Sequence, residues 1–197
     1  MRSIDDIRPL LLCSVVAAGR TVPVFAWAVG GGEGTVLVDT GMIDLHPAVE
    51  EWQPSLHDWP DLGEVVAIVN THLHFDHCGG NRRFPGVPTF VQRAELDASG
   101  GDDYLTEWAR FPGESYVPLD GDAEILPGIS VLSTPGHTVG HQAVVVTTDE
   151  GPVVLAGDVT YFWAELAASA DPSIERIRAL RPRRVWIAHS RRPWDPA

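Results

Sequence analysis

The sequence predicts a mixed α/β domain built in layers, because β-like segments outnumber helical ones and the two kinds alternate in blocks. The 197 residues are enough for one domain with a substantial core and too few for two ordinary ones. Hydrophobic residues make up 44% of the chain and charged residues 21%, a balance typical of globular proteins. We therefore expect a single α/β domain over residues 1–197.

The first part of the chain is predicted to be mainly β structure. Runs of β-branched and apolar residues are separated by glycine-rich turns, such as the three glycines at 30–32. One helix is expected over Pro47–Leu56, with Asp44 as its cap and Pro47 in its first turn. The strands expected in this part are Leu10–Ala17, Val22–Val29, Thr35–Val38 and Val65–Val69.

The remainder of the chain mixes both kinds of element. The turn of a hairpin is expected at Asp149–Pro152, and Asp171 or Ser173 is expected to cap the last helix. The helices expected here are Arg93–Ala98, Asp103–Arg110 and Ser173–Leu180. The strands expected here are Val87–Gln92, Glu124–Leu126, Ile129–Ser133, Gln142–Thr148, Val153–Ala156 and Arg184–Ala188.

Charge and hydropathy limit the classes of partner. The formal net charge is −13, and all fourteen basic residues are arginine. An acidic surface without basic clusters argues against nucleic acid or an anionic membrane as a partner. The apolar stretch 10–18 is short and follows Asp5 and Asp6, so we interpret it as a strand and not as a signal peptide. No run approaches the ~20 apolar residues that span a bilayer, and the expected location is the cytoplasm.

The loop after the Val65–Val69 strand points to function. It holds His72, His74, Asp76 and His77, four potential metal ligands within six residues. Imidazole and carboxylate groups bind Zn²⁺ and comparable divalent ions. Without a metal, this spacing would crowd together several titrating groups that resist desolvation. We therefore interpret the loop as metal-binding.

Three more ligand candidates follow other predicted strands. His137 comes shortly after Ile129–Ser133, Asp158 follows the strand that begins at Val153, and His189 follows the last strand. If those strands are neighbours, seven ligands converge at one edge of the sheets. Seven groups are too many for one catalytic ion, but they fit two ions, with Asp158 bridging and a hydroxide completing the pair.

Other residues near these motifs have more than one interpretation. Asp39 either closes a plain turn after the third strand or orients a ligating histidine. His141 is either structural or supports a ligand, because it follows the His137 turn closely. A structural role is favoured for His46 and His57, because a lone histidine at a loop end is more often structural than a ligand.

The order of these motifs resembles the metallo-β-lactamase superfamily. The resemblance rests on the spacing His72-x-His74-x-Asp76-His77, followed by His137, Asp158 and His189, and on the segments 36–41 and 134–141. It implies a four-layered αβ/βα sandwich with the metals at one edge. It also implies a first triad of metal ligands (His72, His74 and His137), a second triad (Asp76, His77 and His189), and Asp158 as the bridge between the two ions.

Within that superfamily the sequence is most similar to N-acyl-homoserine lactonases. The similar segments are 72–77, 91–96 and 136–142, and Tyr161 matches the position of that family's active-site tyrosine. The resemblance implies a dinuclear-metal hydrolase that opens a lactone ring by attack of a metal-bridging hydroxide. Tyr161 would donate to the substrate carbonyl or its oxyanion, and Asp76 would shuttle the proton.

The resemblance also implies the cofactors and partners. Two divalent metal ions are expected, with Zn²⁺ favoured and Fe, Mn or Co as alternatives. The expected partner is a small-molecule lactone or ester, and a homodimer is left open. Aromatic residues that either line the pocket or belong to the ordinary core are Phe75, Trp108, Phe111, Phe162 and Trp163.

Two other functions stay open at this point. A glyoxalase-II-like thioesterase, or another small-ester hydrolase of the superfamily, would share the metal site. A metal-binding sensor domain would hold metal with no open coordination position and no hydrolysis. The segment between Asp158 and His189 is shorter than is usual in such lactonases, and it helps to shape the substrate pocket.

Overall fold

Two β-sheets face each other and carry helices on their outer sides. The structure, a computed structural model, describes residues 2–32 and 34–196. The larger sheet contains, in spatial order, β4 (Ser55–Leu56), β1 (Ile7–Ala17), β2 (Arg20–Val29), β3 (Thr35–Val38), β5 (Val65–Val69), β6 (Thr89–Gln92) and β7 (Tyr116–Leu119). The smaller sheet contains β12 (Arg184–Trp186), β11 (Gly151–Leu155), β10 (Gln142–Thr148), β9 (Ile129–Ser133) and β8 (Ala123–Leu126).

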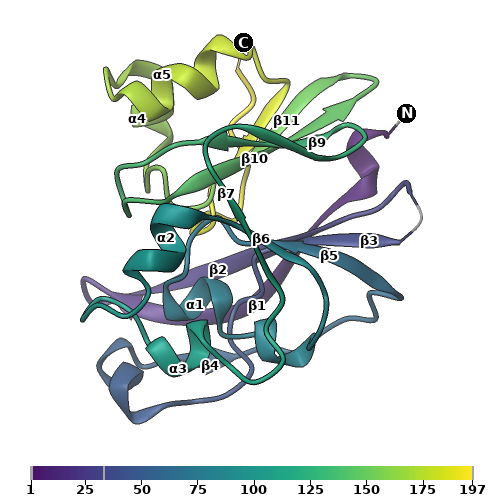
Figure 1. The fold of residues 1–197 in the computed structure, drawn as a ribbon. Helices are drawn as coiled ribbons and strands as arrows, with labels where there is room; N and C mark the ends of the chain where they lie inside the picture. The colour runs from purple at the N-terminus through teal and green to yellow at the C-terminus, as the bar shows by residue number, and fades with distance from the viewer. Residues whose placement is uncertain (1, 33, 197) are drawn as a thin grey trace.

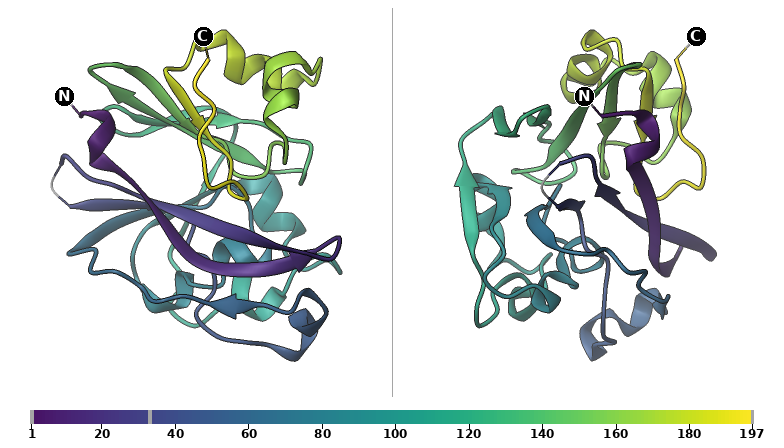
Figure 2. Two further views of the ribbon diagram at one scale, coloured as in Figure 1. Left: turned by 180° about the vertical axis from the view of Figure 1, so that it is seen from behind. Right: turned by 90° about the vertical axis from the view of Figure 1, so that its right-hand side faces the viewer.

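The helices of the described residues are short. They are α1 (Phe75–Cys78), α2 (Arg93–Ala98), α3 (Thr106–Ala109), α4 (Trp163–Ala168) and α5 (Pro172–Ala179), with 3-10 turns η1 (Ile4–Asp6), η2 (Pro47–Trp52) and η3 (Asn81–Arg83). Figure 1 shows α4 and α5 outside the smaller sheet and α1 and α3 outside the larger one, and Figure 2 shows the same layers from two further sides. The predicted four-layered αβ/βα sandwich is therefore confirmed. None of these helices has the length and apolar character needed to cross a membrane.

The largest core lies between the two sheets. Trp27 and Val38 of the larger sheet share one fully buried cluster with Ile129, Val144 and Leu155 of the smaller sheet. Neighbouring residues of a strand point to opposite faces. Val154 therefore packs on the outer side, in a cluster with Leu166 of α4 and Ile177 of α5. Burial on both faces explains why these strands appear in the sequence as nearly continuous apolar runs.

Backbone contacts draw the two sheets together at one edge. The Phe25 N–H in β2 donates to the Ala188 carbonyl just after β12, with an N···O distance of 2.9 Å. The Gln142 N–H at the start of β10 donates to the Thr71 carbonyl just after β5, at 2.8 Å. The loops that follow β5 and β12 therefore meet at this edge, although they belong to different sheets.

The expected elements are mostly confirmed, with ends that shift by a few residues. The predicted bounds hold for Thr35–Val38, Val65–Val69, Arg93–Ala98, Ile129–Ser133 and Gln142–Thr148. The last strand stops at Trp186, earlier than expected, and the helix expected at Asp103–Arg110 is only α3. The last helix is capped by Asp171, whose carboxylate accepts hydrogen bonds from the backbone N–H groups of Ser173 and Ile174.

The helix predicted over Pro47–Leu56 is wrong in type and in extent. The segment forms the 3-10 turn η2, and its cap is His46 and not Asp44. Gln53 has φ of 42° and a left-handed conformation, which ends the turn. Ser55 and Leu56 then pair with Ser14 and Cys13 as the edge strand β4. Pairing with β1 therefore overrides the local helical pattern.

Among the strands and α-helices, β4, α1, β7 and α4 were not predicted from the sequence. The strand β7 contains Pro118, which cannot donate to a neighbouring strand, but β7 lies at the edge of its sheet, where this is tolerated. The helix α4 begins after Phe162, which provides no side-chain cap. The hairpin turn is also tighter than expected, because Gly151 and Pro152 already belong to β11.

Replacing a residue of the core between the sheets should destabilise the whole domain. We expect Ile129→Ala to lower the free energy of unfolding by about 2–5 kcal/mol, because it leaves a cavity between the layers. Urea unfolding followed by circular dichroism measures this change. The matched control is Leu45→Ala, at a side chain that is 64% exposed, which should shift stability by less than about 0.5 kcal/mol. Equal effects of the two substitutions would contradict the assigned core.

Candidate metal centre

The larger sheet supplies four potential ligands at the end of β5. His72 and His74 lie in the loop after the strand, and Asp76 and His77 lie in the single turn of α1 that follows. His72 and His77 are fully buried, and Asp76 is 8% exposed. A buried strand that ends in a one-turn helix thus places these four side chains at the edge where the sheets meet.

The smaller sheet supplies the other three candidates from the same edge. His137 lies in the loop after β9, Asp158 follows β11, and His189 follows β12. Within the described part of the chain, three groups of possible ligand atoms form, each with its atoms within 4.8 Å of one another. These groups are His72 with His74 and His137, His72 with His77 and Asp158, and Asp76 with His77 and His189. All seven sequence-predicted residues are therefore brought together.

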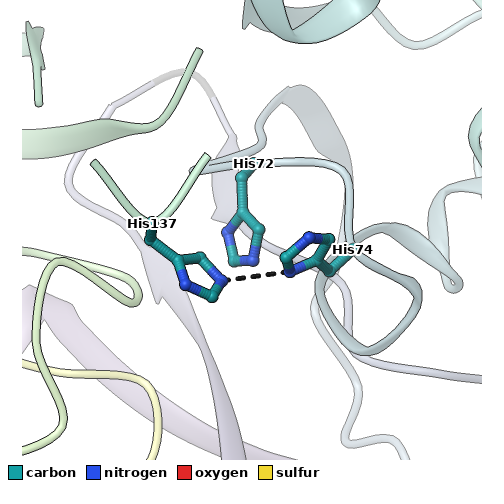
Figure 3. Close-up of side chains that lie close together, drawn as sticks. All are labelled: His72, His74 and His137. Carbon is teal, nitrogen blue, oxygen red and sulfur yellow. Dashed lines mark hydrogen bonds between the residues drawn. The ribbon is translucent and has the colours of Figure 1, made fainter. Parts of the chain in front are cut away.

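Asp158 lies between the two triads. Its Oδ2 is 3.0 Å from His189 Nε2 and 3.7 Å from His137 Nε2, and its Oδ1 is 3.4 Å from His77 Nε2. Figure 3 shows the three rings of the first triad pointing toward one another, with His137 Nε2 3.0 Å from His74 Nδ1. One carboxylate therefore reaches histidines of both triads.

Several buried atoms at the centre of this cluster fit a divalent cation. His72 Nε2, His77 Nε2 and Asp158 Oδ1 are buried and have no hydrogen-bond partner among residues 2–32 and 34–196. Leaving such atoms unpaired costs free energy, because they have lost their contacts with water. Imidazole nitrogens and carboxylate oxygens are ligands of Zn²⁺ and similar ions. The residues present therefore suit bound metal.

The electrostatics of the cluster favour a bound cation. Burial, and then the neighbouring histidines, lower the pKa of His72 well below its usual range. Burial also opposes charge on His77 and His189, but the carboxylates, with Asp158 foremost, raise the pKa of His77 to about 10 and that of His189 to about 9. Burial disfavours charge on Asp158, yet His189 and His77 hold its pKa well below the usual value. The carboxylates therefore favour positive charge inside the cluster, which a divalent cation would supply in place of protons.

Asp39 anchors two of the buried rings. Its Oδ2 accepts hydrogen bonds from His77 Nδ1 at 2.9 Å and from the Thr71 hydroxyl at 2.8 Å. The Thr71 oxygen in turn lies 3.1 Å from His72 Nδ1. Both rings thus have their Nδ1 engaged and their Nε2 directed into the cluster. Of the two interpretations of Asp39, orientation of a histidine is the one that these contacts support.

Two further residues, His141 and Pro23, position the ligands from the smaller sheet. His141 Nδ1 lies 3.0 Å from the Thr134 carbonyl, and His141 Nε2 accepts a hydrogen bond from the Asp158 backbone N–H at 3.1 Å. Burial lowers the pKa of His141 to about 3, which keeps the ring neutral for this role. His189 Nδ1 donates to the Pro23 carbonyl at 2.9 Å. No sequence signal identifies Pro23, because its contact with His189 joins residues 166 positions apart in the chain.

Tyr161 lies at the rim of the cluster. Its side chain is 50% exposed, and its hydroxyl is 3.4 Å from His137 Nδ1. Burial, and then the charges of Asp158 and Asp76, raise the pKa of this phenol. The hydroxyl therefore remains a hydrogen-bond donor near neutral pH.

The aromatic candidates for the pocket divide into two groups. Trp108 and Phe111 are buried in the core, whereas Phe162 and Trp163 are 65% and 40% exposed beside Tyr161. Phe75, between two ligand candidates, packs 6.1 Å from Trp52 between ring centroids.

Comparison with known proteins agrees with this geometry. The model of the metallo-beta-lactamase superfamily matches residues 19–189. An N-acyl homoserine lactonase from a Bacillus species is 35% identical over an alignment of 163 residues, which covers 71% of this chain and 65% of that protein. The N-acyl homoserine lactonase AttM of Rhizobium johnstonii is 31% identical over 68% of this chain and 62% of its own length. The chain thus spans slightly less than two thirds of the curated relatives that it matches.

Solved structures resemble this chain over most of its length. One is an N-acyl homoserine lactone hydrolase with the product N-hexanoyl-L-homoserine bound at the catalytic metal center. It is 27% identical, with a TM-score of 0.76 over 93% of this chain and 91% of that chain. An AiiA variant of B. thuringiensis with N-decanoyl-L-homoserine at the active site gives the same TM-score and identity. By its family model, its fold and its ligand motif, the chain belongs to the metallo-β-lactamase superfamily.

Proposed function

We propose that this chain is a dinuclear metal-dependent lactonase that opens the ring of N-acyl homoserine lactones, formed by one hydrolase domain over residues 1–197. The observation that carries the proposal is the agreement in fold with a lactone hydrolase that binds N-hexanoyl-L-homoserine at its catalytic metal centre. The seven clustered ligand candidates and the phenol of Tyr161 at their rim support it independently.

The two triads would each hold one divalent ion, and Asp158 would contribute to both. This assignment is supported by the grouping of the ligand atoms and by the reach of Asp158 toward His77, His137 and His189. When bound, such ions supply an activated water as nucleophile and Lewis-acid polarisation of the substrate carbonyl. Three points stay predictions: zinc as the metal, with Fe, Mn or Co as alternatives; a homodimer; and a cytoplasmic location.

The chain's own residues would guide charge and protons during ring opening. The Tyr161 hydroxyl, protonated because of its raised pKa, would donate a hydrogen bond to the lactone carbonyl oxygen as negative charge develops there. Asp76 Oδ2 lies 3.8 Å from His77 Nε2 and 3.9 Å from His189 Nε2, inside the cluster. Its carboxylate is thus placed to carry a proton to the leaving alkoxide. The exposed ring of Phe162 would contact the acyl part of the substrate.

The purified protein should contain two divalent metal ions and should open acyl-homoserine lactones. Metal analysis, with a pH-indicator assay of ring opening, tests both points, and chelation followed by added Zn²⁺ should abolish and restore turnover. A thioester panel serves as the comparison. Two bound metals with thioester cleavage and no lactone opening would contradict the proposal.

Replacing the tyrosine should separate catalysis from metal binding. We expect Tyr161→Phe to lower kcat about 10²-fold, because one hydrogen-bond donor to the developing oxyanion is lost. Metal content should stay the same, since the ring is not among the ligand groups. The control is Phe162→Leu, which keeps the phenol and should alter KM more than kcat. Unchanged kcat in Tyr161→Phe would remove this residue from the mechanism.

Replacing the anchor of the two buried rings should weaken metal binding at both triads. In Asp39→Asn one carboxylate oxygen becomes an NH₂ group, so either Oδ2 no longer accepts from His77 Nδ1 and the Thr71 hydroxyl, or Oδ1 no longer accepts from the Thr71 backbone N–H. We expect metal affinity to fall about 10- to 100-fold, measured by competition with a chelating dye. Asp58→Asn, at an exposed position, removes the same charge and should bind metal as the unmodified protein does. A normal affinity in Asp39→Asn would count against this role.

A further inference from the structure

Glu95 is a fully buried carboxylate that the proposed reaction does not use. It lies in the first turn of α2, and its two oxygens accept hydrogen bonds from two separate backbone amides. Oε1 is 2.9 Å from the Leu73 N, and Oε2 is 3.1 Å from the Gly140 N. Burial of a carboxylate is costly unless its oxygens are well bonded, so this arrangement requires an explanation.

The two amides belong to the two loops that carry the first triad. Leu73 lies between His72 and His74, in the loop after β5 of the larger sheet. Gly140 lies three residues after His137, in the loop after β9 of the smaller sheet. One side chain therefore fastens together two loops that come from different sheets.

The positions of the His74 and His137 rings depend on the path of the main chain that carries them. Among the described residues, the hydrogen-bond contacts of the His74 and His137 rings are with each other, at 3.0 Å, and with Tyr161, at 3.4 Å. His72, in contrast, is held through Thr71. The positions of His74 and His137 relative to one another are thus set mainly by how the two loops are joined.

Close packing of the second loop on α2 supports this view. A Cβ atom at Gly140 would lie 2.2 Å from the Glu95 backbone N and 2.4 Å from its Cβ, so only glycine allows this approach. Tyr104 packs on His74 of the first loop, with the two ring centroids 5.4 Å apart. Burial, and then the charge of Glu95, raise the pKa of the Tyr104 phenol, which therefore stays neutral beside the carboxylate.

We propose that Glu95 is a positioning residue for the first triad, which sets the separation of the two loops and thereby the affinity of the three-histidine site for a divalent metal ion. It touches neither metal nor substrate. The inference rests on the metal assignment proposed above. Glu95 would position His74 and His137, as Asp39 positions His72 and His77.

The experiment is a Zn²⁺ titration of the metal-free protein, followed through the imidazole ¹⁵N signals of individual histidines. Glu95→Gln has the same size but only one acceptor oxygen, so one loop loses its bond. We expect the signals of His74 and His137 to need about 10- to 100-fold more free Zn²⁺, while those of His77 and His189 titrate as before. Asp97→Asn, at an exposed position of the same helix, is the matched control for charge and should titrate normally.

Each other outcome would overturn the inference. Unchanged affinity at the first triad, or equal loss at both triads, would show that Glu95 does not act on this site selectively. Loss of folding in Glu95→Gln, seen by circular dichroism with and without Zn²⁺, would make Glu95 a general stability element instead. If the unmodified protein itself took up no metal, the proposed function would fail first, so the two failures are distinguishable.

Discussion

The site depends on one constraint: each buried imidazole proposed as a metal ligand must have one nitrogen committed to the scaffold so that the other is free for the metal. Asp39 meets this constraint for two rings at once, directly for His77 and through Thr71 for His72. The Pro23 carbonyl meets it for His189. A histidine that is fixed in this way has a defined tautomer and a defined direction for its lone pair. The unpaired buried Nε2 atoms of His72 and His77 follow from this arrangement, because the Nδ1 atom of each ring is already engaged.

The same constraint explains how the two sheets must meet. The ligands come from loops after β5, β9, β11 and β12, so neither sheet alone could assemble either the first or the second triad. Backbone bonds from Phe25 to Ala188 and from Gln142 to Thr71 close the edge where these loops converge. The apolar layer between the sheets fixes their spacing, and Glu95 ties two of the loops at the edge itself. Apolar packing thus sets the spacing of the two sheets, and hydrogen bonds join the ligand loops at the edge where the sheets meet.

Much of the site was predictable because its chemistry is concentrated in short motifs. Four ligand candidates lie within six residues, and a strand that ends in such a loop has few structural explanations. Asp39 was recognisable as a candidate for the same reason, since it directly follows a strand. The elements that were missed lack local signals. The edge strand β7 carries Pro118, the helix α4 has no side-chain cap, and β4 exists only because β1 offers it a partner.

The sequence by itself determined the class of fold, the identity of the seven clustered side chains and the phenol beside them. These properties are local, because residue type and strand periodicity do not depend on what lies across the molecule. Only the tertiary structure decided which nitrogen of each ring faces inward and how the two loops of the first triad are joined. Pro23 and His189 lie at opposite ends of the chain, and Glu95 reaches two loops that are distant in sequence. Such contacts arise from the packing of the sheets and of α2, which no short segment encodes.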